Sequence, residues 1–208
     1  MKFLSLLLAA GFLASFAGAE TVHFDSAKPG ALPEGWLAGV TGPGAAQWAV
    51  AADPVAPGAP RVLQQSGAVP SHSYPWCVKK DVSLQDGFVE VKFKPLSGWE
   101  DQAGGVVWRW QDGDNYYVAR GNALEENVIL FRTVKGARRE LHRCAVKVAP
   151  HQWHTLRVDF KGSHFTVTFD GRSVMEWDDE TFKKAGAVGV WTKADSVTAF
   201  NDFQFDGH

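Results

Sequence analysis

Cysteine and clustered charge are both scarce in this sequence. Cys77 and Cys144 are its two cysteines, and no CxxC pair or Cys-His cluster accompanies them, which disfavours a zinc site. Lysine and arginine form no run longer than Arg138-Arg139 or Lys183-Lys184, and the formal net charge is -2 at pH 7. The charge balance argues against a nucleic-acid or anionic-membrane partner.

Long apolar runs are missing beyond the first residues. Residues 3–16 are almost wholly apolar, follow a basic Met1-Lys2 start and precede Ala17-Gly18-Ala19, the small-x-small pattern that signal peptidase accepts. The run is shorter than the roughly 20 residues that a membrane span needs. We expect residues 1–19 to be a secretion signal peptide and residues 20–208 to be one exported domain, periplasmic or extracellular, with no membrane span. An uncleaved N-terminal anchor or buried helix is the alternative.

Export affects what we expect of the two cysteines, because disulfides persist in oxidising compartments. A bridge between Cys77 and Cys144 would close a long loop, and in the chain-entropy model it would stabilise the domain by about 4 kcal/mol. We predict this disulfide, with two free buried thiols as the alternative.

Extended helical patterns are lacking as well. Residues 20–75 are rich in Gly, Pro and Ala, which excludes long helices, and short strands are expected at 22–25, 47–51 and 62–64. One short helical turn is expected at 179–185. From Cys77 onward, alternating segments rich in Val, Phe, Trp, Tyr and Thr recur between turn residues, which predicts an all-β sandwich. These segments are 87–94, 105–111, 115–121, 127–134, 138–141, 154–160, 164–169, 173–177, 187–192 and 198–205.

Two Asp-Gly pairs, Asp112-Gly113 and Asp170-Gly171, give the strongest short-range hairpin signal. If the first pair is a two-residue loop, the cross-strand pairing places a core set on one face and a polar, solvent-accessible set on the other. The core set is Val106, Trp108, Trp110, Asn115, Tyr117 and Ala119, and the polar set is Val107, Arg109, Gln111, Asp114, Tyr116, Val118, Arg120 and Asn122. A one-residue slip of the turn would exchange the two sets.

Two segments resemble a known family: VWRWQDGDNYYVARGNALEENVILFR and WHTLRVDFKGSHFTVTFDGRSVMEWDDETFKKAGAVGVWTKADSVTAFNDF. Both are similar to the concanavalin A-like jelly-roll domains of exported bacterial proteins that are grouped with 3-keto-disaccharide hydrolases. The resemblance implies a two-sheet antiparallel jelly-roll sandwich of the lectin and glucanase type, whose concave face binds sugar. Some members of the group have an assigned activity, and no short catalytic motif carries over to this chain.

One catalytic motif of related glycoside hydrolases is missing. Family 16 enzymes carry Glu-x-Asp-x-x-Glu on one strand, where alternation puts the two reactive carboxylates on the same face about 5 Å apart. The nearest match, Glu90-Val91-Lys92, has lysine in place of the aspartate, which argues against a retaining glucanase of that type. Glu125 is the remaining candidate for a catalytic carboxylate, and a solvated loop acid is the alternative.

Side chains suited to a sugar gather near the end of one expected strand and the start of the next. A guanidinium and side-chain amides can hydrogen-bond sugar hydroxyls, and an aromatic ring can stack on a pyranose. The predicted substrate-binding set is Arg109, Tyr116, Arg120, Asn122, Asn127 and Trp99. The alternative is structural, with Arg120 paired to Glu125 and the amides capping the loop.

No cofactor is required by these residues, although a structural calcium at Asp25 and Asp202 could tie the first strand to the last. We predict a carbohydrate-recognising domain that binds a glycan or glycoside on its concave face. One alternative is a hydrolase or lyase acting on 3-keto-disaccharides or related glycosides, in which Glu125 or a histidine moves protons. A second alternative is a structural protein of the cell envelope. The sequence does not indicate an oligomeric state.

Overall fold

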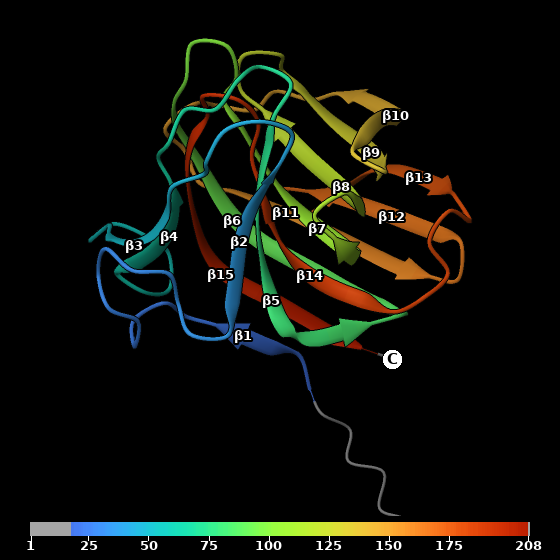
Figure 1. Ribbon diagram of the computed structural model, residues 1–208, viewed down its shortest axis with the longest axis horizontal. Coiled ribbons are helices and arrows are strands. Elements are labelled where there is room, and N and C mark those ends of the chain that lie inside the picture. Colours follow the sequence, from blue (N-terminus) through green and yellow to red (C-terminus); the bar gives the residue numbers. More distant parts are fainter. Residues whose placement is uncertain (1–17, 208) are drawn as a thin grey trace, which may run out of the picture.

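The computed structural model describes residues 18–207, which form two antiparallel β-sheets packed face to face (Figure 1). Sheet A has the order β13-β12-β11-β6-β15-β4-β3, with β1 paired to β15, and sheet B has the order β10-β9-β8-β7-β14-β5-β2. No helix occurs in this part of the chain, so the prediction of an all-β sandwich is confirmed. All but the last two residues of the expected signal peptide lie outside the described residues, and its cleavage stays a prediction.

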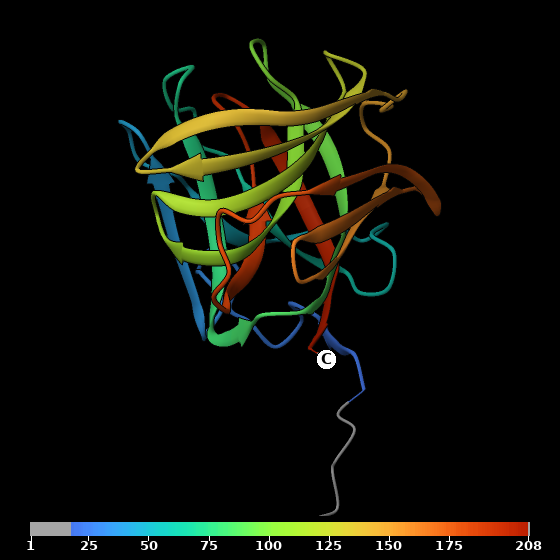
Figure 2. The ribbon, with the colours of Figure 1, turned by 90° about the vertical axis from the view of Figure 1, so that its right-hand side faces the viewer.

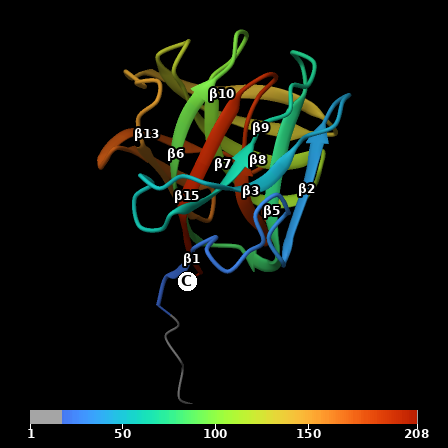
Figure 3. The same ribbon diagram turned by 90° about the vertical axis from the view of Figure 1, so that its left-hand side faces the viewer.

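The strands of sheet A are β1 (Glu20–Val22), β3 (Trp48–Ala52), β4 (Arg61–Gln65), β6 (Gly87–Ser97), β11 (His154–Lys161), β12 (His164–Phe169), β13 (Arg172–Asp178) and β15 (Val197–Gly207). The strands of sheet B are β2 (Trp36–Thr41), β5 (Tyr74–Leu84), β7 (Ala103–Asp112), β8 (Asn115–Asn122), β9 (Asn127–Val134), β10 (Ala137–Ala145) and β14 (Gly186–Trp191). β1 runs beside the C-terminal strand β15, which itself lies against β6 in the middle of sheet A (Figure 3). None of the described residues forms a helix of the length and apolarity that crossing a bilayer requires.

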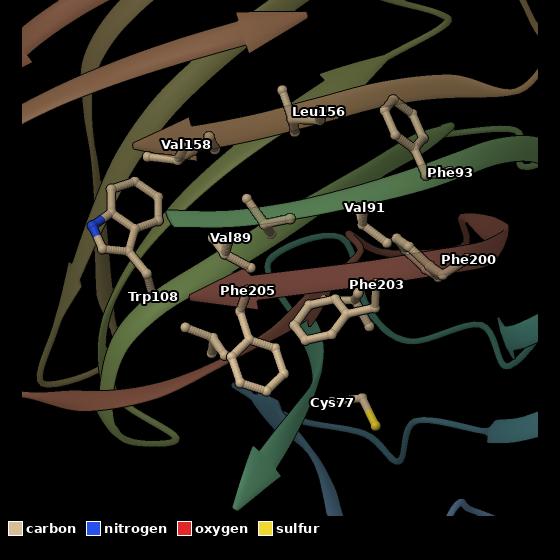
Figure 4. Packing of buried hydrophobic residues seen from close by; sticks show 14 of the residues in the cluster. Cys77, Val89, Val91, Phe93, Trp108, Leu156, Val158, Phe200, Phe203 and Phe205 are labelled. Atoms are coloured by element: carbon tan, nitrogen blue, oxygen red, sulfur yellow. The ribbon is translucent and has the colours of Figure 1, made fainter. Parts of the chain in front are cut away.

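The core between the sheets is built by strands that alternate buried and less buried residues. On β6 the buried positions are Val89, Val91 and Phe93, and on β15 they include Phe200 and Phe203 (Figure 4). Sheet B contributes a stack of Trp108 on Tyr117, with ring centroids 5.3 Å apart, as the hairpin pairing predicts. Complete burial of side chains of this size stabilises the fold by roughly 1.5–3 kcal/mol each.

Two strands were missed from the sequence, β2 and β5. Gly39 interrupts the apolar pattern of β2, yet it is required there because a Cβ at this position would overlap the Trp76 ring of β5. Pro75 lies near the start of β5 and the polar Lys79-Lys80-Asp81 near its end, which hides the alternation. The absence of a side chain at Gly39 therefore makes room for an aromatic ring across the strands.

The helical turn expected at 179–185 does not form. The segment is bound instead by side chains of the neighbouring strands: Phe182 O accepts from Arg109 Nη1 at 2.8 Å, and Ala185 O accepts from Gln111 Nε2 at 3.0 Å. The Asp179 carboxylate accepts from the Thr181 amide at 2.8 Å and from the Tyr117 hydroxyl at 2.6 Å. These long-range bonds outweigh the local preference for a helix.

The two Asp-Gly pairs behave differently. Asp170 and Gly171 both have positive φ, 46° and 77°, as a type I′ hairpin requires. In the other hairpin Asp112 pairs with Asn115, so the loop consists of Gly113 and Asp114, and neither has positive φ. The predicted loop of Asp112 and Gly113 is therefore wrong by one residue.

A β-bulge in β7 compensates for this shift. The register predicted for Trp108 opposite Tyr117 is correct, but three residues, 109–111, then face Tyr116 alone. Arg109 adopts a φ of 46° and points toward Phe160 and Phe165 of the core, whereas Trp110 packs on Trp76 of the outer face at 5.1 Å. The predicted faces of Arg109 and Trp110 are thus exchanged.

The outer face of sheet B is apolar and concave, where the sequence predicted a polar, open face. Tyr116 and Val118 are fully buried in a second hydrophobic cluster on this face. β8, β9 and β10 run across the direction of β2 and β5 (Figure 2). Arg138 of β10 lies 4.2 Å from the ring centre of Tyr74 on β5, although a flat sheet would separate these strands by about 24 Å. The sheet therefore curls over its own outer face.

The predicted disulfide is not formed, and both cysteines are free. Cys77 lies on β5 and Cys144 on β10, with four strands between them, whereas a disulfide requires Cα atoms less than about 7 Å apart. Cys77 is completely buried in the core between the sheets, which raises the pKa of its thiol well above the usual value. It behaves as a small apolar core residue.

Candidate functional site

Three loops meet at one end of sheet B: 98–102 between β6 and β7, 123–126 between β8 and β9, and 192–196 between β14 and β15. The Ala123 amide donates to Gln102 O at 3.0 Å, which joins the first two loops. Ser196 Oγ accepts from the Ala103 amide at 3.0 Å, which joins the first to the third. The set of loops is therefore held by direct contacts, and we call it the loop site.

Asp195 fixes the first loop of the site. Its carboxylate accepts backbone hydrogen bonds from Trp99 at 2.6 Å, Glu100 at 3.1 Å and Asp101 at 3.0 Å. Partial burial alone would raise the pKa of Asp195, but these three amide donors outweigh it and the pKa is lowered. The ionised carboxylate thus keeps the loop in one conformation.

Trp99 stands on this fixed loop with 96% of its surface exposed. Leu124, on the adjacent loop, is 49% exposed. Large aromatic side chains are normally buried because burying them stabilises a fold, so a tryptophan held in water on a rigid backbone indicates a contact surface. The loop site therefore carries one exposed aromatic side chain on a fixed backbone.

Beneath Trp99 lies a buried polar chain. Asn122 Nδ2 donates to Asp101 Oδ1 at 2.7 Å, and Lys193 Nζ lies 2.6 Å from Asp101 Oδ2. Burial raises the pKa of Asp101, while Lys193 opposes this shift. Asn122 Oδ1 accepts from the Leu124 amide at 2.9 Å, so Asn122 also shapes the second loop.

Arg120 and Glu125 form the second polar group of the site. Arg120 Nη2 donates to Glu125 Oε2 at 2.7 Å and Arg120 Nη1 donates to Asn127 Oδ1 at 2.5 Å, while Asn127 Nδ2 donates to Glu125 Oε2 at 3.2 Å. Arg120 is 2% exposed, whereas Glu125 keeps 35% of its side chain in solvent. Burial acts to raise the pKa of Glu125, but the Arg120 charge and these hydrogen bonds prevail and lower it.

The chemistry available at the loop site is hydrogen bonding and stacking. Glu125 is an ionised acceptor, because its carboxylate is held by Arg120 and Asn127 and its pKa is low. Asp101 is completely buried and bound to Lys193, so it does not reach the surface. An acceptor carboxylate and an exposed indole on two joined loops can hydrogen-bond and stack with a ligand rich in hydroxyl groups.

The structure brings together four of the residues predicted to bind substrate, with Glu125 beside them. Trp99 is exposed on a loop of the site, whereas Arg120, Asn122 and Asn127, at the adjoining ends of β8 and β9, are buried and hydrogen-bond within the protein, as the structural alternative expects. Arg109 lies elsewhere, buried under backbone carbonyls of Gln85, Phe182 and Gly162. Tyr116 is fully buried, and its hydroxyl lies 2.7 Å from Thr41 Oγ1.

Asp25 and Asp202 do not form an evident cation site. Asp202 Oδ2 lies 2.6 Å from Lys92 Nζ, so a metal ion would have to displace an ammonium group, and Asp25 is exposed with its backbone carbonyl bound to Arg61. No cluster of three or more His, Cys, Asp or Glu suited to a metal is present among residues 18–207. Calcium binding stays a prediction that this lysine disfavours.

Some residues of this end of sheet B were missed. Asp101, Lys193 and Arg143 are brought in by strand pairing between distant segments, and Arg138 reaches the concave face only because β10 curls. Lys193 and Asp195 stand together in TKADS, where the sequence suggests turn chemistry, and Asp195 does serve the backbone. No local sequence signal links Asp195 with Trp99, nearly a hundred residues earlier.

Comparison with known proteins identifies the fold. No family model and no curated sequence matches this chain. Among solved structures, the carbohydrate binding module CBM66 from Bacillus subtilis is similar with a TM-score of 0.66 and 19% identity, over 81% of this chain and 93% of that one. A Bacillus licheniformis beta-glucanase is similar with a TM-score of 0.59 and 12% identity, over 93% and 99%. A Crh5 transglycosylase in its apo form is similar with a TM-score of 0.59 and 15% identity, over 92% and 85%. The chain therefore has the concanavalin A-like jelly-roll fold.

Proposed function

We propose that this protein is an exported carbohydrate-recognising domain whose loop site and adjoining concave face bind a glycan or glycoside. The observation that carries the proposal is Trp99, a 96% exposed indole on a loop fixed by three backbone hydrogen bonds to Asp195. A loop held in this way loses little backbone entropy when a sugar stacks on the indole that it carries, and Glu125 of the adjoining loop can accept hydrogen bonds from hydroxyl groups. The carbohydrate binding module CBM66 and the beta-glucanase, which have the same fold, support a sugar ligand.

Binding is favoured over catalysis by the state of the carboxylates. Glu125 is ionised and bound to Arg120 and Asn127, and Asp101 is buried against Lys193, so neither is a protonated acid that faces solvent. A hydrolase of the 3-keto-disaccharide type would need an acid or base in reach of the glycosidic bond. Membership of that hydrolase group, and a catalytic role for Glu125, remain secondary proposals.

Retention on a glycan array tests the function. We expect the mature protein to be retained on a subset of glycans, and Trp99→Ala to reduce its affinity for them about tenfold or more because the stacking surface is lost. Glu125→Gln should weaken binding less, since the amide keeps one acceptor oxygen. Val55→Ala is the matched control, because Val55 is 79% exposed on the β3–β4 connection of the other sheet.

Three outcomes separate the possibilities. If Trp99→Ala loses retention and Val55→Ala keeps it, the result supports glycan binding at the loop site. Equal retention of the Trp99→Ala variant and the wild type places the site elsewhere. Release of a sugar product from a bound glycoside, detected by mass spectrometry and abolished by Glu125→Gln, would favour the hydrolase in place of the binding domain.

A further inference from the structure

We propose that the glycan bound on the concave face carries an anionic group, a carboxylate or a sulfate, and that Arg138 of β10 binds it. The proposal rests on the proposed function, since it names the class of sugar recognised by the same face. It depends on the position of Arg138, on its lack of a counterion and on its distance from the loop site.

The guanidinium of Arg138 lies against aromatic rings from three strands. Its Cζ atom lies 4.2 Å from the ring centre of Tyr74 on β5, 4.3 Å from that of Phe131 on β9 and 5.6 Å from that of Trp191 on β14. Stacking of this kind attracts the cation and restricts its rotamers. Arg138 is thus prepared for a planar, two-point contact with a carboxylate.

Arg138 has no counterion among the described residues, whereas three other cations near it do. Arg120 pairs with Glu125 at 2.7 Å, Arg143 with Glu140 at 2.7 Å and Lys193 with Asp101 at 2.6 Å. Within residues 18–207 no carboxylate lies within 4.0 Å of Arg138, and its Nη1 is buried without an acceptor. A partly desolvated charge with no partner destabilises the unliganded state, and an anionic ligand would remove that cost.

Arg109, a buried arginine elsewhere in the protein, provides a comparison for Arg138. Arg109 donates to three backbone carbonyls, those of Gln85, Phe182 and Gly162, at 2.6–2.9 Å, and it lies 3.3 Å from Asp86. Every nitrogen of that guanidinium therefore has an acceptor. Arg138 differs from Arg109 in this respect, because its Nη1 is buried without an acceptor.

One aromatic ring connects Arg138 to the loop site. The Phe131 ring centre lies 4.3 Å from Arg138 Cζ and 5.7 Å from Arg120 Cζ, and Arg120 holds Glu125. A glycan that stacks on Trp99 and passes Glu125 would thus extend toward Arg138. The positive charge of Arg120, which is paired with Glu125, would also reduce the repulsion between the Glu125 carboxylate and an acidic sugar unit at Arg138.

The test is a calorimetric titration with paired oligosaccharides. The two oligosaccharides of a pair differ in one unit, which is glucuronate or galacturonate in one and glucose or galactose in the other. A sulfated oligosaccharide is titrated as well, to distinguish a carboxylate from a sulfate ligand. We expect the acidic member to bind the wild type about tenfold more tightly than its neutral twin. Arg138→Gln should abolish this preference, so that the acidic and neutral twins bind the variant with equal affinity.

Arg139→Gln is the matched control, because Arg139 is the next residue of β10 and is exposed. It lies opposite Arg132 in the register of β10 and β9, so its side chain is on the other face of sheet B from Arg138. This variant should keep the preference. If Arg138→Gln does not fold, Arg138→Lys retains the charge without the planar fork and should reduce the preference severalfold. Equal affinity of the wild type for acidic and neutral twins, or a preference that survives Arg138→Gln, would overturn the inference alone. If no member of any pair binds, the proposed function fails as well.

Discussion

At the scale of single residues, Asp195 has the widest influence on the loop site. One carboxylate accepts from three consecutive amides, and this fixes the backbone that carries Trp99. The lowered pKa of Asp195 shows that these amides stabilise its charged form. Site geometry and folding stability therefore depend on the same group.

We predict that Asp195→Ala lowers the free energy of unfolding by about 1–3 kcal/mol at neutral pH, because hydrogen bonds to a charged acceptor are lost. The Asp195 contribution is present above the unfolded-state pKa of about 3.9 and is lost as pH falls through the lower folded-state pKa. Urea denaturation at neutral and acid pH measures this. An equal stability difference between wild type and variant at both pH values would contradict the role given to the carboxylate.

Tyr117 makes the stability of the protein depend on pH in the alkaline range. Its hydroxyl donates to Asp179 Oδ1 at 2.6 Å, and burial together with that carboxylate raises the pKa of Tyr117 to about 12. Because the folded-state pKa is raised, the stabilisation is complete below the unfolded-state pKa of about 10 and is lost as pH rises toward 12. We expect Tyr117→Phe to be less stable at neutral pH and to lose less stability than the wild type on alkaline titration. Thermal melts followed by circular dichroism measure both, and parallel pH profiles would refute the assignment.

At the scale of elements, alternation predicts strands well and bends poorly. The ten alternating segments after Cys77 all lie within observed strands or overlap them, because each has one face on the core. The bulge at 109–111 could not be predicted, because it depends on carbonyl groups of Phe182 and Gly162 far along the chain. For the same reason the sequence placed Arg109 beside Tyr116, whereas the two lie on opposite faces of the sheet.

The concave face depends on close contact between β2 and β5. We predict that Gly39→Ala destabilises the protein by about 1–3 kcal/mol, because its Cβ would overlap the Trp76 ring and force the ring to move. Gly30→Ala is unsuitable as a comparison, because Gly30 has a φ of 78° that strains any other residue. Ala38→Gly serves as the comparison, because it changes the adjacent position of β2 by removing a side chain. Chemical denaturation compares them, and a Gly39→Ala variant as stable as the wild type would show that the ring has room to shift.

At the scale of the whole molecule, the sandwich is built without a disulfide between Cys77 and Cys144. Much of the loop site was also predictable, since Arg120, Asn122, Glu125 and Asn127 are close in sequence and share one strand end. The positions of Arg138 and Lys193 could not be predicted, because they depend on the curl of sheet B and on the pairing of distant strands. The sequence predicted a bridge between two cysteines that the sheet order holds apart.

We predict that a reducing agent leaves the melting temperature unchanged, because no disulfide constrains the unfolded chain. A thiol reagent should label both cysteines after denaturation without reductant. In the native protein the half-buried Cys144 should react and the buried Cys77 should not. A melting temperature lowered by reductant would indicate a bridge in solution.

The central claim is that a sugar binds at the loop site, and the location of binding can be measured directly. Titration of the labelled protein with a retained glycan, followed by nuclear magnetic resonance, should shift the indole and backbone signals of Trp99 together with amides of 98–102 and 123–126. Signals of the outer face of sheet A should stay in place. Shifts confined to sheet A, or binding without any change at Trp99, would contradict the account.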